Sequence, residues 1–549
     1  MLPSDVVWTE MQNNLLQRLA LSALLFAGLP HSDGSAWAQP VSETRVQVRE
    51  FRVTGNTLLP QSRIDEILEP FKGERNLAEL QAAAAALQAL YRDAGYGSVI
   101  AYLPQQSGPS GTATLAVLEG RIRRVLVLGN QASSEAVVRR SLPGLVEGQT
   151  PQLRRIDAQV QLANENPARQ VAVSLEAGSA PGDVDANVSV TESAQSSWIL
   201  GLDNTGNAGS DRWRANVGYQ RAGLWDLDHM LSLQFQTSLR KPDSMRVFSA
   251  SYRAPLYEAG LMLDAFAAYS DVDGGTTSTV AGPLQFSGKG EVLGVRLSGQ
   301  IARRGELEQR LSFGLDHRAY INDCAIGGLP AGACGTAGES VAVHPVAVDY
   351  QLQWAGAVPM ALQLTLAQGL DVGGRHGGVA DFAAVRAGAK PGYTSLRFNA
   401  STQLKLMEQW QLALRLQGQV SPDALVPGEQ FGVGGSTAVR GYEEREVTGD
   451  SGLAGALELQ GPNLVDSGFS AIDQLRLLGF VDAGRAMNRL GTPCRDLQSR
   501  CNLSSIGMGA RFGGRGLQAS LDWAVALDNG VRTSRHDQRL HLRVVYSFH

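Results

Sequence analysis

Arg440 is the residue in this sequence whose type and surroundings best suit a specific charged interaction. It stands between a glycine-rich apolar run and an acidic cluster in FGVGGSTAVRGYEERE, residues 431–446. A guanidinium group is permanently charged, so it needs a carboxylate partner wherever it is enclosed. Asp482, in the segment LRLLGFVDAGRAMN, is the candidate partner. We predict an ion pair between Arg440 and Asp482; the alternative is that Arg440 faces solvent at a loop tip.

The spacing of the other polar residues does not support catalysis. The segment TGDSGLAG, residues 448–455, has the Gly-Asp-Ser-Gly context of a serine protease nucleophile, but no upstream His and Asp occupy matching surroundings. The glycine pairs Gly434-Gly435 and Gly507/Gly509 lack the Lys and the helix start of a phosphate-binding loop. We therefore predict no enzyme activity and no cofactor.

The four cysteines form two short-range pairs, each inside a loop rich in glycine and proline. Cys324 and Cys334 lie in NDCAIGGLPAGACGT, and Cys494 and Cys501 lie in GTPCRDLQSRC. Neither pair has metal-site spacing or an accompanying His. We predict two local disulfides, which suit a compartment outside the cytoplasm, and no metal site.

The N-terminus and the overall charge limit where the protein acts. Residues 1–38 combine Arg18, a short apolar stretch and a small-residue cleavage site, which predicts a signal peptide, whether translation begins at Met1 or Met11. A short linker, residues 39–45, follows. The net charge of −5, from 48 basic and 53 acidic side chains, argues against a nucleic-acid partner, because such binding needs a concentrated basic face.

Two similar units follow the linker, and each reads as strand, helix, helix, strand, strand. The first, residues 46–120, begins with FRVTGN after a short lead, and the second, residues 121–193, begins with VLVLGN in the same way. Within the first unit, apolar residues from Leu77 to Tyr91 recur on one helix face, and Gly95 ends the helix. The repetition predicts two small α+β modules.

The remaining residues, 194–549, alternate apolar and polar side chains with a period of two. In WQLALRLQGQV, for example, Leu412 and Leu414 take one face, and Gln411 and Arg415 take the other. The segments are about ten residues long, which is the length of a tilted strand that crosses a bilayer. Short turns alternate with long polar loops. We predict a transmembrane β-barrel of sixteen antiparallel strands, which is wide enough to enclose an aqueous lumen.

The segment between the eleventh and twelfth predicted strands, residues 421–451, is too long for an ordinary turn. We expect it to fold into the lumen, because several of its side chains would be poorly placed in water: Phe431, Val433, Val439 and Tyr442. On the thirteenth strand the alternation points Phe480 and Asp482 inward, and Gly479 and Gly484 leave room for a close approach of the loop.

Together these features resemble the two-partner secretion transporters, the haemolysin secretion and activation proteins of the outer membrane. The resemblance covers almost all of the mature chain, and the two α+β modules resemble POTRA (polypeptide-transport-associated) domains. It is carried by two motifs besides the modules and the barrel: VRGY (Val439, Arg440, Gly441, Tyr442) and GFVDAG (Gly479, Phe480, Asp482, Gly484). It implies that the VRGY loop enters the lumen and that Arg440 meets Asp482 there.

The resemblance also implies where the protein acts and on what. We expect a barrel in the bacterial outer membrane, in contact with lipid and monomeric, with both modules in the periplasm. The expected partner is a haemolysin- or adhesin-like, β-helical exoprotein, secreted to the cell surface without nucleotide hydrolysis. Family members often carry an N-terminal helix that plugs the pore, but only residues 39–44 separate the cleavage site from the first module. We therefore expect the folded-in loop to close the pore.

The first module supplies the expected docking site, because an extended segment of the partner can add a strand to an exposed sheet edge. The candidate docking residues are Leu87 and Tyr91, on the helix beside this edge, and the residues of the edge itself: Ser98, Val99, Ile100, Ala101, Tyr102 and Leu103. Two other functions stay open. A barrel-assembly factor would share the modules, the loop and the pore, and a diffusion porin would need no modules.

Overall fold

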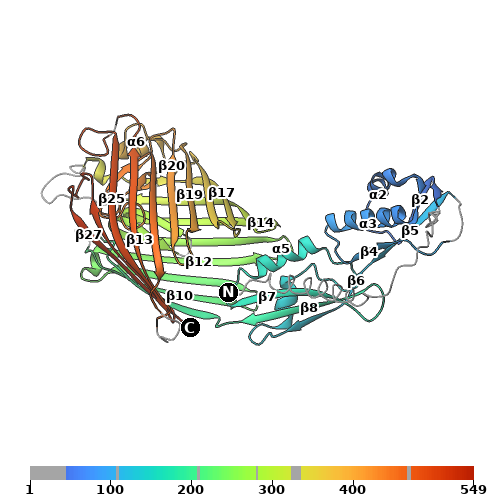
Figure 1. Ribbon diagram of the computed structural model, residues 1–549. Coiled ribbons are helices and arrows are strands. Elements are labelled where there is room, and N and C mark those ends of the chain that lie inside the picture. The colour runs from blue at the N-terminus through green and yellow to red at the C-terminus, as the bar shows by residue number, and fades with distance from the viewer. Residues whose placement is uncertain are drawn as a thin grey trace, which may run out of the picture.

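The computed structural model describes residues 45–106, 111–206, 211–279, 282–322, 335–465, 472–491 and 493–549. The predicted signal peptide and both Cys324 and Cys334 lie outside these residues. Two modules extend from one rim of a β-barrel (Figure 1). We call this rim the module rim and the opposite one the far rim. Across the described ranges, no helix combines the length and the apolar character needed to span a membrane.

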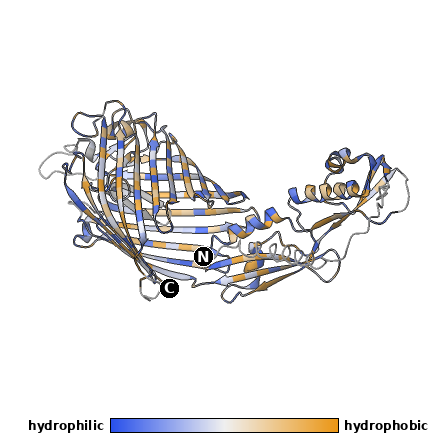
Figure 2. Ribbon diagram, viewed as in Figure 1, coloured by the Kyte–Doolittle hydropathy of each residue, from blue (hydrophilic) through white to orange (hydrophobic). Residues whose placement is uncertain are grey.

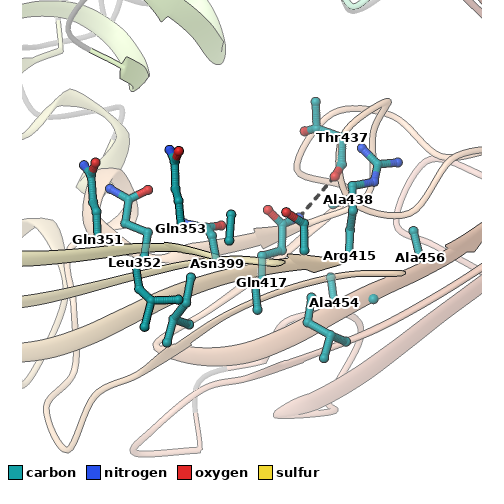
Figure 3. Close-up of a pocket in the computed structure, with 17 residues that line it drawn as sticks. Gln351, Leu352, Gln353, Asn399, Arg415, Gln417, Thr437, Ala438, Ala454 and Ala456 are labelled. Atoms are coloured by element: carbon teal, nitrogen blue, oxygen red, sulfur yellow. Dashed lines mark hydrogen bonds between the residues drawn. The ribbon is translucent and has the colours of Figure 1, made fainter. Parts of the chain in front are cut away.

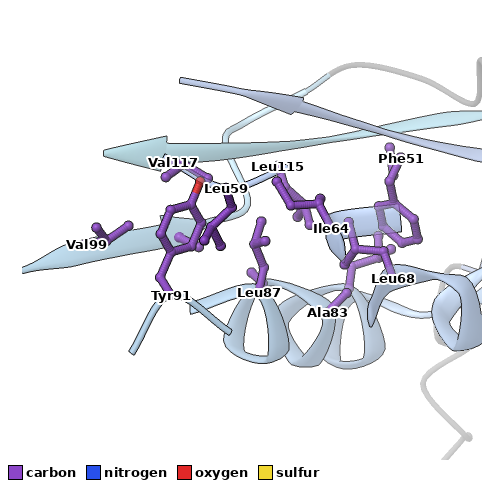
Figure 4. Close-up of a cluster of buried hydrophobic side chains, with 14 of the residues drawn as sticks. Phe51, Leu59, Ile64, Leu68, Ala83, Leu87, Tyr91, Val99, Leu115 and Val117 are labelled. Atoms are coloured by element: carbon purple, nitrogen blue, oxygen red, sulfur yellow. The ribbon is translucent and has the colours of Figure 1, made fainter. Parts of the chain in front are cut away.

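The first module follows the predicted order of strand, helix, helix, strand, strand. Its three main strands form one sheet in the order β2 (Glu50–Thr54), β5 (Thr112–Glu119) and β4 (Val99–Tyr102). Helices α2 (Gln61–Leu68) and α3 (Leu77–Asp93) cover one face of it (Figure 4). Strands β1 (Val46–Val48) and β3 (Gly73–Arg75) form a separate pair, and the 3₁₀ turn η1 (Glu69–Phe71) follows α2.

The core of the first module lies between α3 and the sheet (Figure 4). Leu87 and Tyr91 of α3 are completely buried, as is Leu115 of β5. Each such side chain stabilises the fold by about 1.5–3 kcal/mol. Burial, together with the nearby Glu119 carboxylate, raises the pKa of Tyr91. The predicted apolar face of α3 therefore forms part of this core, except that Leu77 at the start of the helix is exposed.

The second module repeats this arrangement. Its sheet has the order β6 (Arg121–Leu128), β8 (Asp183–Glu192) and β7 (Arg169–Ala177), and its helices are α4 (Glu135–Ser141) and α5 (Leu153–Ala163). In each module the first strand pairs in parallel with the last, so the two helices form the crossover between them.

The loop after the first strand is held in the same way in both modules. Gly55 and Gly129 have φ angles of +83° and +87°, and a Cβ on either would lie 2.2 or 2.4 Å from a backbone oxygen of the neighbouring strand. Glycine is required at both positions. The carboxylates of Glu119 and Glu192 then accept hydrogen bonds from backbone N–H groups of the loop: Thr57 and Leu58 for Glu119, and Gln131, Ala132 and Ser133 for Glu192.

Sixteen antiparallel strands within the described residues close the barrel, when β16 and β17, which flank His344, count as one. Strand β27 pairs with β9 and completes the ring. The predicted barrel and strand number are confirmed. In chain order the strands are β9 (Ser196–Asp203), β10 (Arg214–Leu224), β11 (His229–Ser238), β12 (Met245–Leu256), β13 (Leu261–Thr279), β14 (Gly282–Arg304), β15 (Leu307–Ile321), β16 (Val341–Val343), β17 (Pro345–Trp354), β18 (Met360–Gly369), β19 (Thr394–Lys405), β20 (Gln411–Val420), β23 (Ser451–Asn463), β24 (Gln474–Met487), β25 (Arg500–Gly514), β26 (Leu517–Ala526) and β27 (Gln538–Phe548).

The two faces of the barrel strands differ in polarity. On β14, Leu293, Val295 and Leu297 point outward and are exposed, whereas Arg296 and Ser298 share the inner face. Figure 2 shows the same alternation of hydrophobic and hydrophilic residues along many strands. An apolar outer face and a polar lumen are typical of strands that cross a lipid bilayer.

A buried carboxylate of the barrel binds the second module to the module rim. Asp228 lies in the turn between β10 and β11 and forms an ion pair with Arg169 of β7, and both side chains are buried. The Asn166 amide (2.6 Å) and the Tyr257 hydroxyl also donate to Asp228. Removing one partner of such a buried pair typically costs about 3–5 kcal/mol, because the other charge is left uncompensated.

A second contact reaches the inner wall of the barrel. Glu165, just after α5, accepts hydrogen bonds from Arg310 of β15 and from the Gln300 amide of β14 (3.1 Å). Arg310 and Gln300 are opposite one another in the strand register, on the face that points into the lumen. The second module therefore touches the entrance of the lumen on the side of β14 and β15.

Candidate functional site

The loop between β20 and β23, residues 421–450, lies inside the barrel, and we call it the lumen loop. It contains the 3₁₀ turn η4 (Pro427–Glu429) and a small hairpin of β21 (Phe431–Val433) and β22 (Val447–Gly449). Gly434 and Gly435 have φ angles of +107° and +100°, which only glycine adopts readily, so they allow the chain to turn after β21. The tip that follows carries VRGY.

Arg440 at the tip is 1% exposed and Asp482 of β24 is completely buried. The Asp482 carboxylate accepts three hydrogen bonds from Arg440: from Nε (2.7 Å), from Nη2 (2.7 Å) and from the backbone N–H (3.0 Å). The guanidinium also stacks on the Phe480 ring, 3.3 Å from its centroid. The structure therefore brings together Arg440 and Asp482 as the alternation of β24 requires.

Two further carboxylates surround the same guanidinium. Arg440 Nη1 donates to Glu458 of β23 (2.8 Å) and lies 3.6 Å from an Asp522 oxygen of β26. Glu458 is shared with Arg415, and Asp522 with Arg511 (2.9 and 2.8 Å). Enclosed charges are tolerated only when all of them are paired, so this network fixes the tip against β23, β24 and β26. We call it the tip clamp.

The other residues of VRGY fit the tip to the wall. Val439 is completely buried, and Gly441, with φ of +93°, donates its N–H to Nε2 of His541 on β27 (3.0 Å). The Tyr442 hydroxyl lies 2.9 Å from two backbone oxygens of the barrel, those of Ser504 and Asp528. All four residues of the motif are therefore held against the wall.

The two glycines predicted to make room for the loop differ in position. Gly484 does so, because a Cβ there would lie 2.6 Å from Val433 and 3.1 Å from Val439 of the lumen loop. Gly479 does not: it shares the outward face of β24 with Val481, and a Cβ there would have no heavy atom nearer than a backbone oxygen 4.0 Å away. The prediction for Gly479 was wrong because successive residues of a strand point to opposite faces.

The acidic cluster after VRGY binds the far-rim side of the barrel. Glu446 accepts from the backbone N–H and the hydroxyl of Thr533 (2.9 and 3.0 Å), and Glu443 forms ion pairs with Arg532 and Arg539 (both 3.1 Å). Glu444 accepts from Ser436 within the loop itself. The acidic residues that follow Arg440 therefore have partners of their own.

A second buried anchor holds the stem of the lumen loop. Glu429 is 2% exposed and accepts from Arg318 of β15 (3.0 and 3.1 Å), from Arg397 of β19 (3.1 Å) and from the Tyr320 hydroxyl (2.8 Å). We call this group the stem anchor. The sequence patterns did not reveal four partners in these contacts: Glu429, Glu458, Asp522 and His541. The alternation places the last three on inner faces, but no sequence signal pairs them with Arg440 or Gly441.

The predicted docking residues fall into two groups. β4 is an edge strand. Ile100 and Tyr102 are exposed on the face of the sheet away from the helices, whereas Val99 and Ala101 are buried on the face that packs against the helices. Ser98 precedes the strand and binds the Gly120 oxygen (3.3 Å), and Leu103 packs partly on the core. Leu87 and Tyr91 were wrongly predicted as docking residues, because an apolar helix face packs on its own sheet.

Of the two predicted disulfides, Cys494–Cys501 is present, with the Cα atoms 6.2 Å apart. It lies in the far-rim loop after β24, and Cys501 packs against the lumen loop. Among the residues that the structure describes, no three His, Cys, Asp or Glu side chains are grouped to hold a metal ion.

Comparisons with known proteins identify relatives of this architecture. The family described as haemolysin secretion/activation protein ShlB/FhaC/HecB matches residues 182–512, and the ShlB-type POTRA domain matches residues 46–120. The chain is 25% identical over 425 residues to the outer membrane transporter CdiB of Escherichia coli O6:K15:H31 (strain 536 / UPEC), across 74% of this chain and 67% of that protein.

Two solved structures share the fold. CdiB from Escherichia coli superposes with a TM-score of 0.73 at 20% identity, covering 99% of this chain and 98% of that one. CdiB from Acinetobacter baumannii gives 0.70 at 17% identity, covering 100% and 98%. At these identities the likeness establishes the common fold of barrel and modules.

Proposed function

Because the chain belongs to the haemolysin secretion/activation protein family, the two-partner secretion transporters of the outer membrane, we propose that it exports an unfolded, β-rich exoprotein without hydrolysing a nucleotide. The barrel lies in the outer membrane, the POTRA modules lie in the periplasm, and the partner is a secreted protein. The proposed cargo is of the haemolysin- or adhesin-like, β-helical class. The barrel closes within one chain, which supports a monomeric transporter surrounded by lipid.

The open edge of β4 supports docking of the partner on the first module. Within the described residues β4 pairs with no strand other than β5. On its outer edge the Ala101 N–H donates to the Gln88 side chain in a long hydrogen bond (3.4 Å), and the exposed Ile100 (52%) and Tyr102 (49%) offer apolar contact beside that edge. An extended segment that adds a strand there gains backbone hydrogen bonds whatever its sequence, and pockets for alternate side chains give selectivity.

The edges of the second module are less suited to this role, because on each edge strand side chains bind both the N–H and the oxygen of one residue, at distances shorter than the 3.4 Å of the single such bond on β4. On β7, the backbone N–H and oxygen of Val171 bind the Asn164 side chain (2.6 and 3.0 Å). On β6, those of Val125 bind Glu147 and Arg139 (3.2 and 2.6 Å). We infer that the first module receives the partner and that the second module, bound to the barrel through Asp228, positions it at the lumen.

The buried tip clamp is the observation that carries the proposal of a gated conduit. A loop that crosses the lumen and is held there by Arg440, Asp482 and Glu458 blocks a passing chain until it shifts. The sharing of one guanidinium among several carboxylates allows it to exchange partners as it moves. Folding of the partner outside the cell, which prevents its return, is the proposed driving force.

The docking edge can be tested without disturbing the barrel. We expect the double variant Ile100→Asp/Tyr102→Asp to insert normally but to leave the partner in the periplasm, because both side chains are exposed and support no core. Leu128→Asp, at an exposed position (57%) on β6, is the matched control and should secrete normally. Normal secretion by the double variant would exclude this edge.

The class of function can be tested by removing the chain. Accumulation of one large exoprotein in the periplasm supports secretion, accumulation of many unassembled barrels would indicate a barrel-assembly factor, and neither effect would indicate a diffusion porin. The shared modules, loop and pore make the barrel-assembly factor the second candidate.

A further inference from the structure

Four uncharged amide side chains form a continuous row on the inner wall of the barrel. In the strand register Gln351 of β17 is opposite Gln363 of β18, Gln363 is opposite Asn399 of β19, and Asn399 is opposite Gln417 of β20. All four belong to the inward face of their strands. We call these residues the amide row.

The amide row joins two parts of the molecule that the proposed function uses. At β15, the residue opposite Gln351 is Arg310, which is bound by Glu165 of the second module. At β20, the Gln417 amide donates to the Thr437 oxygen near the tip of the lumen loop (3.3 Å). The row therefore runs from the entrance of the lumen, where the second module touches the wall, to the loop that closes it.

Free space lies between the row and the lumen loop. A cavity of about 420 Å³ is lined by the four amides and by Thr437 and Ala438 of the loop. Figure 3 shows Gln351 and Gln417 on the side of the sheet that faces Thr437, with Leu352 on the other side. In the described part of the chain the side-chain amides of Gln351, Gln363 and Asn399 have no hydrogen-bond partner, so they are available to a molecule in this space.

The chemistry of the row fits the backbone of an extended polypeptide. Each amide offers hydrogen-bond donors and an acceptor, as a peptide group does. It can therefore bind the backbone of each residue that passes, whatever the side chain. The row carries no charge, so charged residues in transit meet neither a strong trap nor strong repulsion. The tip clamp, on β23, β24 and β26, is by contrast dense in charge and already fully engaged with Arg440.

We propose that the amide row is the surface along which the exported partner crosses the lumen as an extended chain, between β17–β20 and the lumen loop. This rests on the proposed secretion function. It assigns the passage to one wall: the loop moves away from β17–β20, and the chain follows the amides from the second module toward the far rim.

Site-specific photo-crosslinking tests this assignment. A photoreactive residue would replace Gln351 or Gln363 in the full-length transporter, and the partner would be stalled in transit by a folded domain fused to its C-terminus. The control position is Gln234 on β11, an inward-facing amide outside the row. We expect the stalled partner to crosslink severalfold more at Gln351 and Gln363 than at Gln234. Equal yields at all three positions, or a higher yield at Gln234, would overturn the proposal.

Charge substitution provides an independent readout. We expect the variant Gln351→Glu/Gln363→Glu/Asn399→Asp to slow secretion severalfold, most strongly for partners rich in acidic residues, whereas Gln234→Glu keeps the wild-type rate. An unchanged rate in the triple variant would contradict the proposed path. Failure of the wild-type chain to secrete any partner would instead overturn the proposed function itself, so the two failures are distinguishable.

Discussion

Glu429 and Arg440 lie in the same loop, and each is bound by barrel residues of the charge opposite to its own. The residues that bind Glu429 and those that bind Arg440 lie on different strands. Glu429 meets Arg318 on β15 and Arg397 on β19, whereas Arg440 meets Asp482 on β24. The lumen loop is therefore attached to two parts of the wall at once and spans the lumen between them. Opening the pore requires release of the tip clamp, the stem anchor or both, and the two can be separated by mutation.

The tip clamp predicts a specific pattern of charge rescue. Arg440→Asp or Asp482→Arg alone should raise channel conductance and abolish secretion, because each leaves a buried charge unpaired at a cost of about 3–5 kcal/mol. The double reversal should restore closure only in part, since the carboxylate introduced at position 440 would then face Glu458. Adding Glu458→Gln should increase the recovery. Conductance in planar bilayers measures closure, and a double reversal no better than either single reversal would argue against the clamp.

The stem anchor predicts a different defect. Glu429→Gln should loosen the stem and raise conductance while the tip stays bound, because Arg318 and Arg397 lose their shared carboxylate at a cost of about 3 kcal/mol. Spin labels on the stem should report increased motion, and labels near Arg440 should not. Glu308→Gln, which removes a carboxylate exposed to solvent on β15, is the control. Equal loosening of tip and stem would show that the two anchors are one unit.

The contrast between the two anchors explains how far the sequence could predict this site. The period-two alternation of β24 places Asp482 in the lumen, and the unusual length and composition of the loop place Arg440 there too. Glu429 escaped prediction because it belongs to no strand: its partners are chosen by the path of the loop across the barrel. The alternation of polar and apolar residues along a strand predicts which face of the strand a residue occupies. It does not predict which residues from distant parts of the chain will contact that residue.

The same limit applies to the modules. Repetition predicted both α+β units correctly, and helix periodicity correctly predicted that α3 has one apolar face. The prediction that Leu87 and Tyr91 take part in docking was wrong, because both side chains are enclosed by their own sheet. The buried contact between Arg169 and Asp228 joins two domains, and no segment of the sequence taken alone contains it.

Glu192 predicts a pH-dependent stability of the second module. Burial raises the pKa of Glu192, but hydrogen bonds from the backbone N–H groups of Ala132 and its neighbours outweigh this and hold the pKa below its usual range. A lowered folded-state pKa means that the stabilisation is complete above the unfolded value of about 4.3 and is lost as the pH falls through the folded pKa.

Hydrogen exchange of residues 131–133 checks this dependence. At neutral pH these amides should exchange more slowly in the wild type than in Glu192→Gln, and the difference should vanish at pH values well below about 4. Comparison at the same pH cancels the intrinsic exchange rate. Glu176→Gln, exposed on β7, serves as the control, and a wild-type advantage that persists in acid would refute the role of the carboxylate.

Asp228 predicts how firmly the second module is held beneath the lumen. Asp228→Asn keeps the side-chain shape and the positive φ of +67°, which Asn tolerates, but removes the charge that pairs with the buried Arg169. We expect broader distances between spin labels on the second module and the module rim, and slower secretion, while the barrel stays folded. Asp226→Asn, exposed in the same turn with φ of +56°, keeps an oxygen that can accept from the Ser134 hydroxyl of the second module (3.0 Å) and removes no buried ion pair, so it should leave both unchanged. If the distances stay narrow in Asp228→Asn, the ion pair does not set the orientation of the module, and the contact of Glu165 with Arg310 must do so instead.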